Sequence, residues 1–362
     1  MFVEILTGIF EDKNLVPSDV LAGLILLSHK AVREKEEERN STGVVGNTIF
    51  HNMGVSLVKV EMENAADGGS CLEIVSEKER IRLDWSLTKH YYNYAAAAYG
   101  YMWWMMQRPC THCCKLSYYL HCCHCRQAQQ YHVQDDGLCQ PNLAAIKAML
   151  EVAEEDIIMF DNRNTIEEVP FLLVADRSTK SLVISIRGTL SLHDMLTDLN
   201  AGKTRISEET TDWEGHQGMV RAARNVSRRL HRGGAGLDLA GCLSEAQYEG
   251  YEVVVTGHSL GAGTATILAF LLREKYPARA VRCYAFSPPG GLLSEAAARE
   301  SEKFTVSLIV GDDVIPRLSL PNIKILSSEI RHSIRTCSLP KYQIFGESPC
   351  VSSDLSCGVL TE

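Results

Sequence analysis

The pentapeptide Gly257-His258-Ser259-Leu260-Gly261 constrains the fold of this 362-residue chain more than any other feature. It follows the apolar run Tyr251 to Thr256, which is typical of a buried strand, and it precedes the helical pattern of Gly263 to Arg273. A serine at the tip of such a sharp turn has strained backbone angles, so small residues are needed two positions before and after it. A bare G-x-S-x-G also occurs by chance, but this context predicts a nucleophile elbow.

From Asp156 onward, short apolar runs alternate with helical patterns. Strands interleaved with helices indicate an α/β fold, in which helices cover both faces of a sheet with parallel central strands. Gly233 to Gly250 contains five glycines and is expected to be a surface loop. The predicted strands are Ile157 to Phe160, Phe171 to Asp176, Ser181 to Ile186, Tyr251 to Thr256, Val281 to Phe286 and Phe304 to Val310, and the predicted helices are Leu192 to Leu199, Met219 to Leu230, Gly263 to Arg273 and Ile323 to Ile334.

A catalytic serine requires a histidine to accept its proton and a carboxylate to orient that histidine. In hydrolase folds the acid follows the serine along the chain. Asp312 and Asp313 come directly after the predicted strand Phe304 to Val310, at the carboxyl end where a side chain reaches the elbow. Either aspartate is in position to serve as the acid, and a solvated turn is the alternative interpretation.

An oxyanion hole requires two backbone N–H groups that point at the developing charge. The residue after the serine, Leu260, supplies one of them. The loop that closes the predicted strand Ser181 to Ile186 supplies the second, since Gly188 allows a close approach and Thr189 adds a hydroxyl. The alternative is a simple strand-to-helix turn in which Thr189 or Ser191 caps the next helix, and the two interpretations are compatible.

The net charge of −9 argues against nucleic acid as a partner, since short basic patches such as Arg221 to Arg232 do not form a long stripe. No apolar run reaches the roughly 18 to 20 residues that span a bilayer. The aromatic segment Tyr91 to Met106 suits either a membrane surface or a buried helix. The N-terminus lacks the features of a signal peptide, so a cytosolic chain is expected.

Seven of the thirteen cysteines fall within Cys110 to Cys139. Two C-x-x-C pairs with interleaved histidines are compatible with zinc, but the gap between the pairs is shorter than in zinc ribbons. A membrane-near loop with acylated thiols and an unstructured insertion remain open, and together they are favoured. No metal site is therefore predicted.

Several motifs together resemble the class 3 lipases. Within that family the chain is most similar to the sn-1-specific diacylglycerol lipases, which share the run Ser287 to Leu293. The likeness covers most of the chain. The motifs are Ser185 to Thr189, His216 to Met219, Val255 to Gly263, Cys283 to Pro289 and Asp313 to Arg317.

The resemblance implies an α/β-hydrolase-like fold and a serine hydrolase that releases the sn-1 fatty acid of diacylglycerol, leaving 2-monoacylglycerol. It also implies membrane association on the cytosolic side. Ser259 matches the nucleophile, Asp313 the acid, and Thr189 and Leu260 the oxyanion positions, while Ser191 to Leu199 corresponds to an amphipathic lid. Calcium is implied only by the family, since no carboxylates occur here at calcium-binding spacing.

The resemblance also divides the chain and raises a question about activity. We expect an N-terminal helical and extended region (1–109), a Cys-rich loop (110–140), a lipase domain (141–345) and a divergent tail (346–362). The family places its catalytic histidine downstream of the acid, where this chain has only His332. The 362 residues alone are therefore expected to hydrolyse acylglycerols poorly. A noncatalytic acylglycerol-binding protein, a triacylglycerol lipase and a phospholipase A1 are the alternatives.

Overall fold

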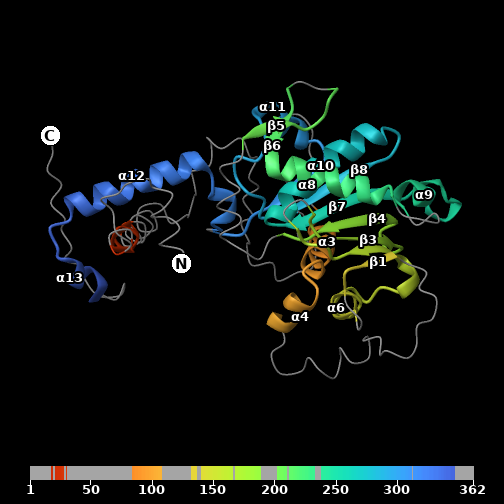
Figure 1. Cartoon of the computed structure of the whole chain (residues 1–362), viewed down its shortest axis with the longest axis horizontal. Helices are drawn as coiled ribbons and strands as arrows, with labels where there is room; N and C mark the ends of the chain where they lie inside the picture. The colour runs from red at the N-terminus through yellow and green to blue at the C-terminus, as the bar shows by residue number, and fades with distance from the viewer. Residues whose placement is uncertain are drawn as a thin grey trace. The chain divides into compact units, whose positions relative to one another are not determined.

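The computed structural model describes residues 18, 21–27, 30, 84–107, 132–136, 140–165, 168–188, 202–209, 212–232, 238–311 and 313–346. Thr189, Asp312, the expected lid Ser191 to Leu199, nearly all of the Cys-rich segment and the tail 347–362 lie outside these residues. The chain forms two compact units, one of Met1–Asn52 with Leu318–Glu362 and one of Met53–Arg317. The second unit contains the sheet (Figure 1).

Within the described residues, the main sheet has seven strands in the order β1-β2-β3-β4-β7-β8-β9. The strands β4, β7, β8 and β9 are mutually parallel, while β3 runs antiparallel to both β2 and β4. A separate pair, β5 (Lys203–Arg205) and β6 (Glu214–His216), is antiparallel. The main strands are β1 (His132–Gln134), β2 (Ile157–Asp161), β3 (Phe171–Asp176), β4 (Ser181–Ile186), β7 (Glu252–His258), β8 (Val281–Phe286) and β9 (Thr305–Leu308).

The central strands are buried on both faces, which explains their continuous apolar sequences. In β7, Val253 and Val255 face one hydrophobic core and Val254 faces the other. The helices α8 (Gln217–Leu230) and α10 (Leu260–Lys275) cover the first face. The helices α3 (Trp85–Ala97) and α6 (Pro141–Leu150) cover the second (Figure 1). The predicted α/β-hydrolase-like architecture is thus confirmed.

Most predicted elements are present, with small differences in their ends. The last predicted strand is shorter than expected, since β9 covers only Thr305–Leu308. The expected loop Gly233 to Gly250 is partly helical, because α9 (Leu239–Ser244) and η3 (Ala246–Tyr248) lie within it. The apolar residues Leu239, Cys242 and Leu243 are buried there. Other short elements among the described residues of this unit are η1 (Glu154–Asp156), α11 (Glu295–Ser301) and η4 (Ile315–Arg317).

The aromatic segment Tyr91 to Met106 is divided between a buried and a partly exposed helix. Tyr91, Tyr94 and the following alanines of α3 are buried against the sheet. In α4 (Tyr101–Gln107), Trp104 is buried while Met102 and Met106 are exposed. The described helices include none that is long and apolar enough to cross a membrane.

The smaller unit contains α12 (Leu320–Thr336) and α13 (Lys341–Gly346). Residues 21–27 are also helical, as the sequence predicts for this region. Gly23 lies against Ile330 of α12, where a Cβ atom would approach the Ile330 side chain to 2.7 Å.

Candidate active site

Ser259 occupies a strained turn between the end of β7 and the start of α10. Its backbone angles are φ 57° and ψ −129°, a region that costs a non-glycine residue about 1–3 kcal/mol. Its N–H donates to the Phe286 carbonyl at 2.9 Å, and its carbonyl accepts from Ala262 and Gly263. The predicted elbow therefore has the expected backbone geometry, with the serine only 6% exposed.

The two glycines of the pentapeptide are required by close backbone contacts. A Cβ atom on Gly257 would lie 2.6 Å from the carbonyl carbon and oxygen of Gly261. A Cβ atom on Gly261 would lie 2.3 Å from the Ile186 oxygen and 2.7 Å from the Gly188 nitrogen. The elbow consequently packs directly on the end of β4, which brings Gly188, two residues after β4, against Gly261.

One of the two expected oxyanion donors is placed by the structure. Leu260 is the first residue of α10, and the N–H of the first helical residue has no acceptor within the helix. The helix dipole adds positive potential at this end. The second expected donor, Thr189, lies outside the described residues, but the preceding Gly188 is buried at the end of β4.

Asp313 lies at the same edge of the sheet as Ser259. His258, Phe286 and Leu308 are paired across β7, β8 and β9, so the segment after β9 emerges beside the elbow. The Asp313 side chain accepts from the Ile315 N–H at 3.0 Å, and Arg317 donates to the Asp313 carbonyl. Burial lowers the pKa of His258, and the Asp313 carboxylate acts in the opposite direction, which is consistent with proximity of the two side chains.

Three of the histidines in this unit have other partners. His258 Nδ1 is 3.0 Å from the Tyr99 hydroxyl, and His90 Nε2 is 2.5 Å from Asp176. His231 Nε2 is 2.6 Å from the Tyr276 hydroxyl. A fourth, His216, is buried at the N-cap of α8, whereas His332 is exposed on α12 in the other unit.

Tyr99 is a site residue that the sequence analysis did not identify. It is buried in the turn between α3 and α4, and its hydroxyl interacts with His258 and with the Gly188 backbone. Burial raises the pKa of Tyr99 to about 12, and the hydrogen bond to Gly188 acts against this rise. The phenol is therefore neutral at physiological pH and links the elbow to the expected oxyanion loop. Only an aromatic cluster before the lipase core hints at this position in the sequence.

No group of three or more potential metal ligands occurs among the residues that the structure describes. The cysteine pairs that are compatible with zinc, within Cys110 to Cys139, fall outside that part of the chain. The interpretations of those cysteines therefore stay predictions from the sequence.

Comparison with known proteins connects this geometry to a family. Residues 183–323 match the family described as Lipase (class 3). The chain is 32% identical over 353 residues to human diacylglycerol lipase-alpha, covering 94% of this chain and 32% of that protein. It is 36% identical to mouse diacylglycerol lipase-beta, covering 94% of this chain and 47% of that protein. The chain thus spans a third to a half of the length of these relatives.

Solved structures with a similar arrangement of helices and strands include a mono- and diacylglycerol lipase from Aspergillus oryzae. That structure is 19% identical, with a TM-score of 0.45, and the match covers 66% of this chain and 74% of that one.

Proposed function

Because residues 183–323 match the class 3 lipase family and the chain is similar to diacylglycerol lipases over 94% of its length, we propose that it is a serine ester hydrolase that acts on diacylglycerol. The proposed reaction releases the sn-1 fatty acid and leaves 2-monoacylglycerol. The observation that carries the proposal is the strained turn at Ser259, at the junction of β7 and α10. The similarity to diacylglycerol lipases over 94% of the chain supports the substrate class.

In the proposed mechanism, the Ser259 hydroxyl attacks the sn-1 ester carbonyl and gives its proton to a histidine. The negative charge that develops on the carbonyl oxygen is stabilised by the backbone N–H groups of Leu260 and Thr189. The histidine then protonates the departing glycerol oxygen, which frees 2-monoacylglycerol. Water hydrolyses the acyl-serine and releases the fatty acid.

Asp313 is proposed to orient the histidine of this reaction and to stabilise its charged form. His90, His231 and His258 have other partners. We therefore propose that the general base is the histidine that the family resemblance implies downstream of the acid. The term extended protein is used below for this chain joined to the histidine-bearing region that the resemblance implies for the family downstream of the acid.

The proposal is tested with a diacylglycerol that carries different acyl chains at the sn-1 and sn-2 positions. We expect the extended protein to release the sn-1 fatty acid and to accumulate 2-monoacylglycerol, as measured by mass spectrometry. Equal release of both chains would contradict the positional assignment. Hydrolysis of a triacylglycerol or of a phospholipid sn-1 ester at a higher kcat/KM would instead favour a triacylglycerol lipase or a phospholipase A1.

The proposed substrate resides in membranes, so we also propose that the protein acts at a membrane surface, on its cytosolic side. The supporting observation is the exposed apolar face of α4, which Met102, Met105 and Met106 form. Exposed apolar side chains beside charged or polar ones favour insertion between lipid headgroups.

Replacing Met102, Met105 and Met106 with serine is expected to reduce flotation of the chain with liposomes several-fold, because each exposed apolar side chain contributes to membrane binding. Trp104 is left intact because it is buried. The control replaces Ile325, an exposed apolar residue of α12, with serine. Unchanged flotation of the triple variant, or an equal loss in the control, would show that α4 does not bind the membrane.

A further inference from the structure

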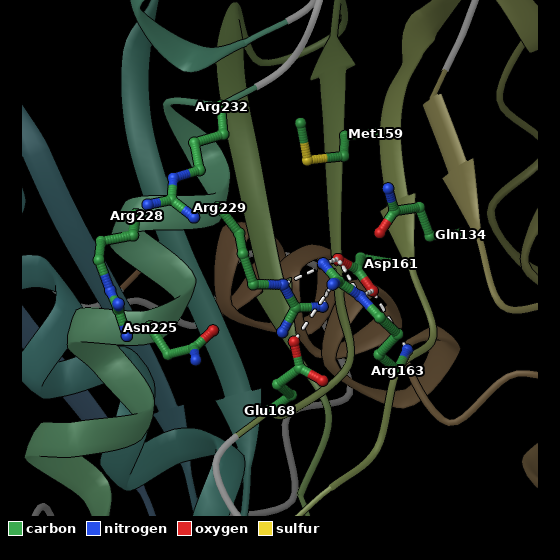
Figure 2. A pocket seen from close by; sticks show the side chains of 9 residues that line it. All are labelled: Gln134, Met159, Asp161, Arg163, Glu168, Asn225, Arg228, Arg229 and Arg232. Atoms are coloured by element: carbon green, nitrogen blue, oxygen red, sulfur yellow. Dashed lines mark hydrogen bonds and ion pairs between the residues drawn. The ribbon is translucent and has the colours of Figure 1, made fainter.

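A small cavity with an excess of arginine lies between the C-terminal part of α8, the strands β1 and β2, and the segment that follows β2 (Figure 2). The cavity has a volume of about 260 Å³. Four arginines line it, namely Arg163, Arg228, Arg229 and Arg232, together with the carboxylates of Asp161 and Glu168. The formal charge of the lining is therefore +2, in a chain whose net charge is −9.

The base of the cavity is a charge-balanced network. Asp161 is 2% exposed and receives hydrogen bonds from Arg229 Nε at 2.8 Å and from Arg163 Nε at 3.0 Å. Arg163 also pairs with Glu168 at 3.2 Å. Burial by itself raises the pKa of Asp161, but the hydrogen bonds from the two arginines outweigh it and hold the pKa below its usual value. Asp161 is thus ionised at neutral pH, and its two partners are fixed in place.

The excess positive charge comes from Arg228 in the last turn of α8 and from Arg232 just after the helix. Arg228 and Arg232 are exposed, and among the described residues neither side chain has a hydrogen bond or an ion pair with a carboxylate. Arginine near a helix C-terminus is favoured by the helix dipole, which is a structural reason for these residues. That effect does not explain why four guanidinium groups line one cavity, since guanidinium groups repel each other at short range.

One buried side-chain atom in the wall, the Asn225 oxygen, has no hydrogen-bond partner among the described residues. An asparagine amide presents either its oxygen or its N–H₂ group after rotation, so Asn225 is able to serve as a donor. Arg229 is 9% exposed, and its Nη2 atom forms an ion pair with the Asp161 carboxylate. The donors without an acceptor among the described residues are therefore those of the exposed Arg228 and Arg232.

We propose that this cavity binds a phosphate group, either free or as a phosphomonoester. A phosphate dianion matches the +2 charge of the lining, and its oxygens accept hydrogen bonds from the forked donors of arginine. The volume is below the roughly 300–1,000 Å³ of pockets for drug-sized ligands, so it suits a headgroup and excludes an acyl chain.

The register of the sheet places this cavity at the same edge as Ser259. Asp161 pairs with Phe171, Phe171 with Ile186, and Ile186 with Gly257. Three strand spacings separate Asp161 from Gly257, which corresponds to about 15 Å. A lipid with a phosphomonoester headgroup is therefore one source of the ligand, and a soluble phosphate compound is the other.

The decisive variant is Arg228→Gln with Arg232→Gln, which removes the excess charge without breaking the Asp161 network. Arg282→Gln with Arg299→Gln is the matched control, because it removes two exposed arginines elsewhere on the same unit. Binding of glycerol 3-phosphate to the whole chain is measured by calorimetry at physiological salt, where charges farther apart than about 8 Å are screened. Thermal unfolding verifies that both variants are folded.

We expect glycerol 3-phosphate to bind the wild type and the control variant alike. We expect it to bind the Arg228/Arg232 variant at least about tenfold more weakly, since that variant lacks two guanidinium groups that would donate charge-assisted hydrogen bonds to the phosphate. Absence of binding to the folded wild type, or an equal loss in both variants, would overturn the proposal.

A second measurement distinguishes the two sources of phosphate. Phosphatidylcholine vesicles with and without phosphatidic acid are tested for flotation of the chain. Flotation that needs phosphatidic acid and is lost in the Arg228/Arg232 variant identifies a lipid headgroup as the ligand. Binding of glycerol 3-phosphate without this flotation identifies a soluble phosphate compound.

Discussion

Replacing Ser259 with alanine is expected to abolish covalent labelling of the extended protein by a fluorophosphonate probe, while the wild type is labelled. The probe reacts with an activated serine hydroxyl, and the proposed hydroxyl is the one on the strained turn before α10. Turnover of diacylglycerol is expected to fall by about 10⁶-fold, the scale of loss when a serine protease loses its nucleophile.

The substitution Ser259→Ala removes only the side-chain hydroxyl, so the test is specific for the proposed nucleophile. Ser259 donates its backbone N–H to Phe286, and an alanine retains that bond as well as the carbonyl contacts to α10. The fold is therefore expected to survive, and circular dichroism verifies this. Labelling that persists in the alanine variant would show that another residue is the nucleophile. Absence of labelling in the wild type would show that Ser259 is not activated.

Turnover of diacylglycerol by the extended protein distinguishes the two aspartates that could support Ser259. Asp313→Asn in the extended protein is expected to reduce kcat by about 10⁴-fold, the loss seen when a triad aspartate is converted to its amide. Asp312→Asn is the matched control, because it changes the neighbouring carboxylate. A loss confined to Asp312→Asn would reverse the assignment of the acid.

The elements that the sequence predicted well are those determined by local patterns. The strands β3, β4 and β8 match their predicted bounds, since each is a mostly apolar run whose residues are buried, apart from Arg282 of β8. The elbow was predictable for the same reason, because strand, turn and helix follow one another within a short segment. Local steric demand alone accounts for the positions of Gly257 and Gly261.

The features that the sequence analysis missed depend on contacts between distant segments. Tyr99 meets His258 across 159 residues, and no local pattern indicates that contact. The ion pairs of Asp161 with Arg229 join β2 to the end of α8, so the arginine-lined cavity exists only in the folded chain.

The helix α9 was missed for a different reason. The glycines between Gly233 and Gly250 favour the prediction of a loop. The short apolar pattern of Leu239, Cys242 and Leu243 nevertheless has the spacing of residues that share one face of a helix. Asp238 caps this helix by accepting from the Gly241 N–H, which is a recognisable start signal. The sequence therefore contained enough information to predict α9, but the high glycine content of the segment favoured a loop.

Replacing Gly261 with alanine is expected to lower the free energy of unfolding by about 3 kcal/mol or more, the upper part of the range for overpacked sites. The new methyl group would lie 2.3 Å from the Ile186 oxygen and 2.7 Å from the Gly188 nitrogen. Both atoms belong to backbone at the end of β4, so no change of rotamer relieves the contact. The gain in helix propensity, about 1 kcal/mol, is too small to offset it.

Two other glycines provide a graded control for this prediction. At Gly263 the added methyl group meets the sulfur of Met219 at 2.5 Å, and a flexible methionine side chain is able to move. At Gly202 nothing lies within 4 Å, so the substitution is expected to change stability by no more than about 0.5 kcal/mol. Urea unfolding should therefore rank the alanine variants with Gly261 as the least stable, then Gly263, then Gly202. A Gly261 variant as stable as the Gly202 variant would show that the elbow does not pack on β4 and would remove the structural basis for placing the oxyanion loop beside Ser259.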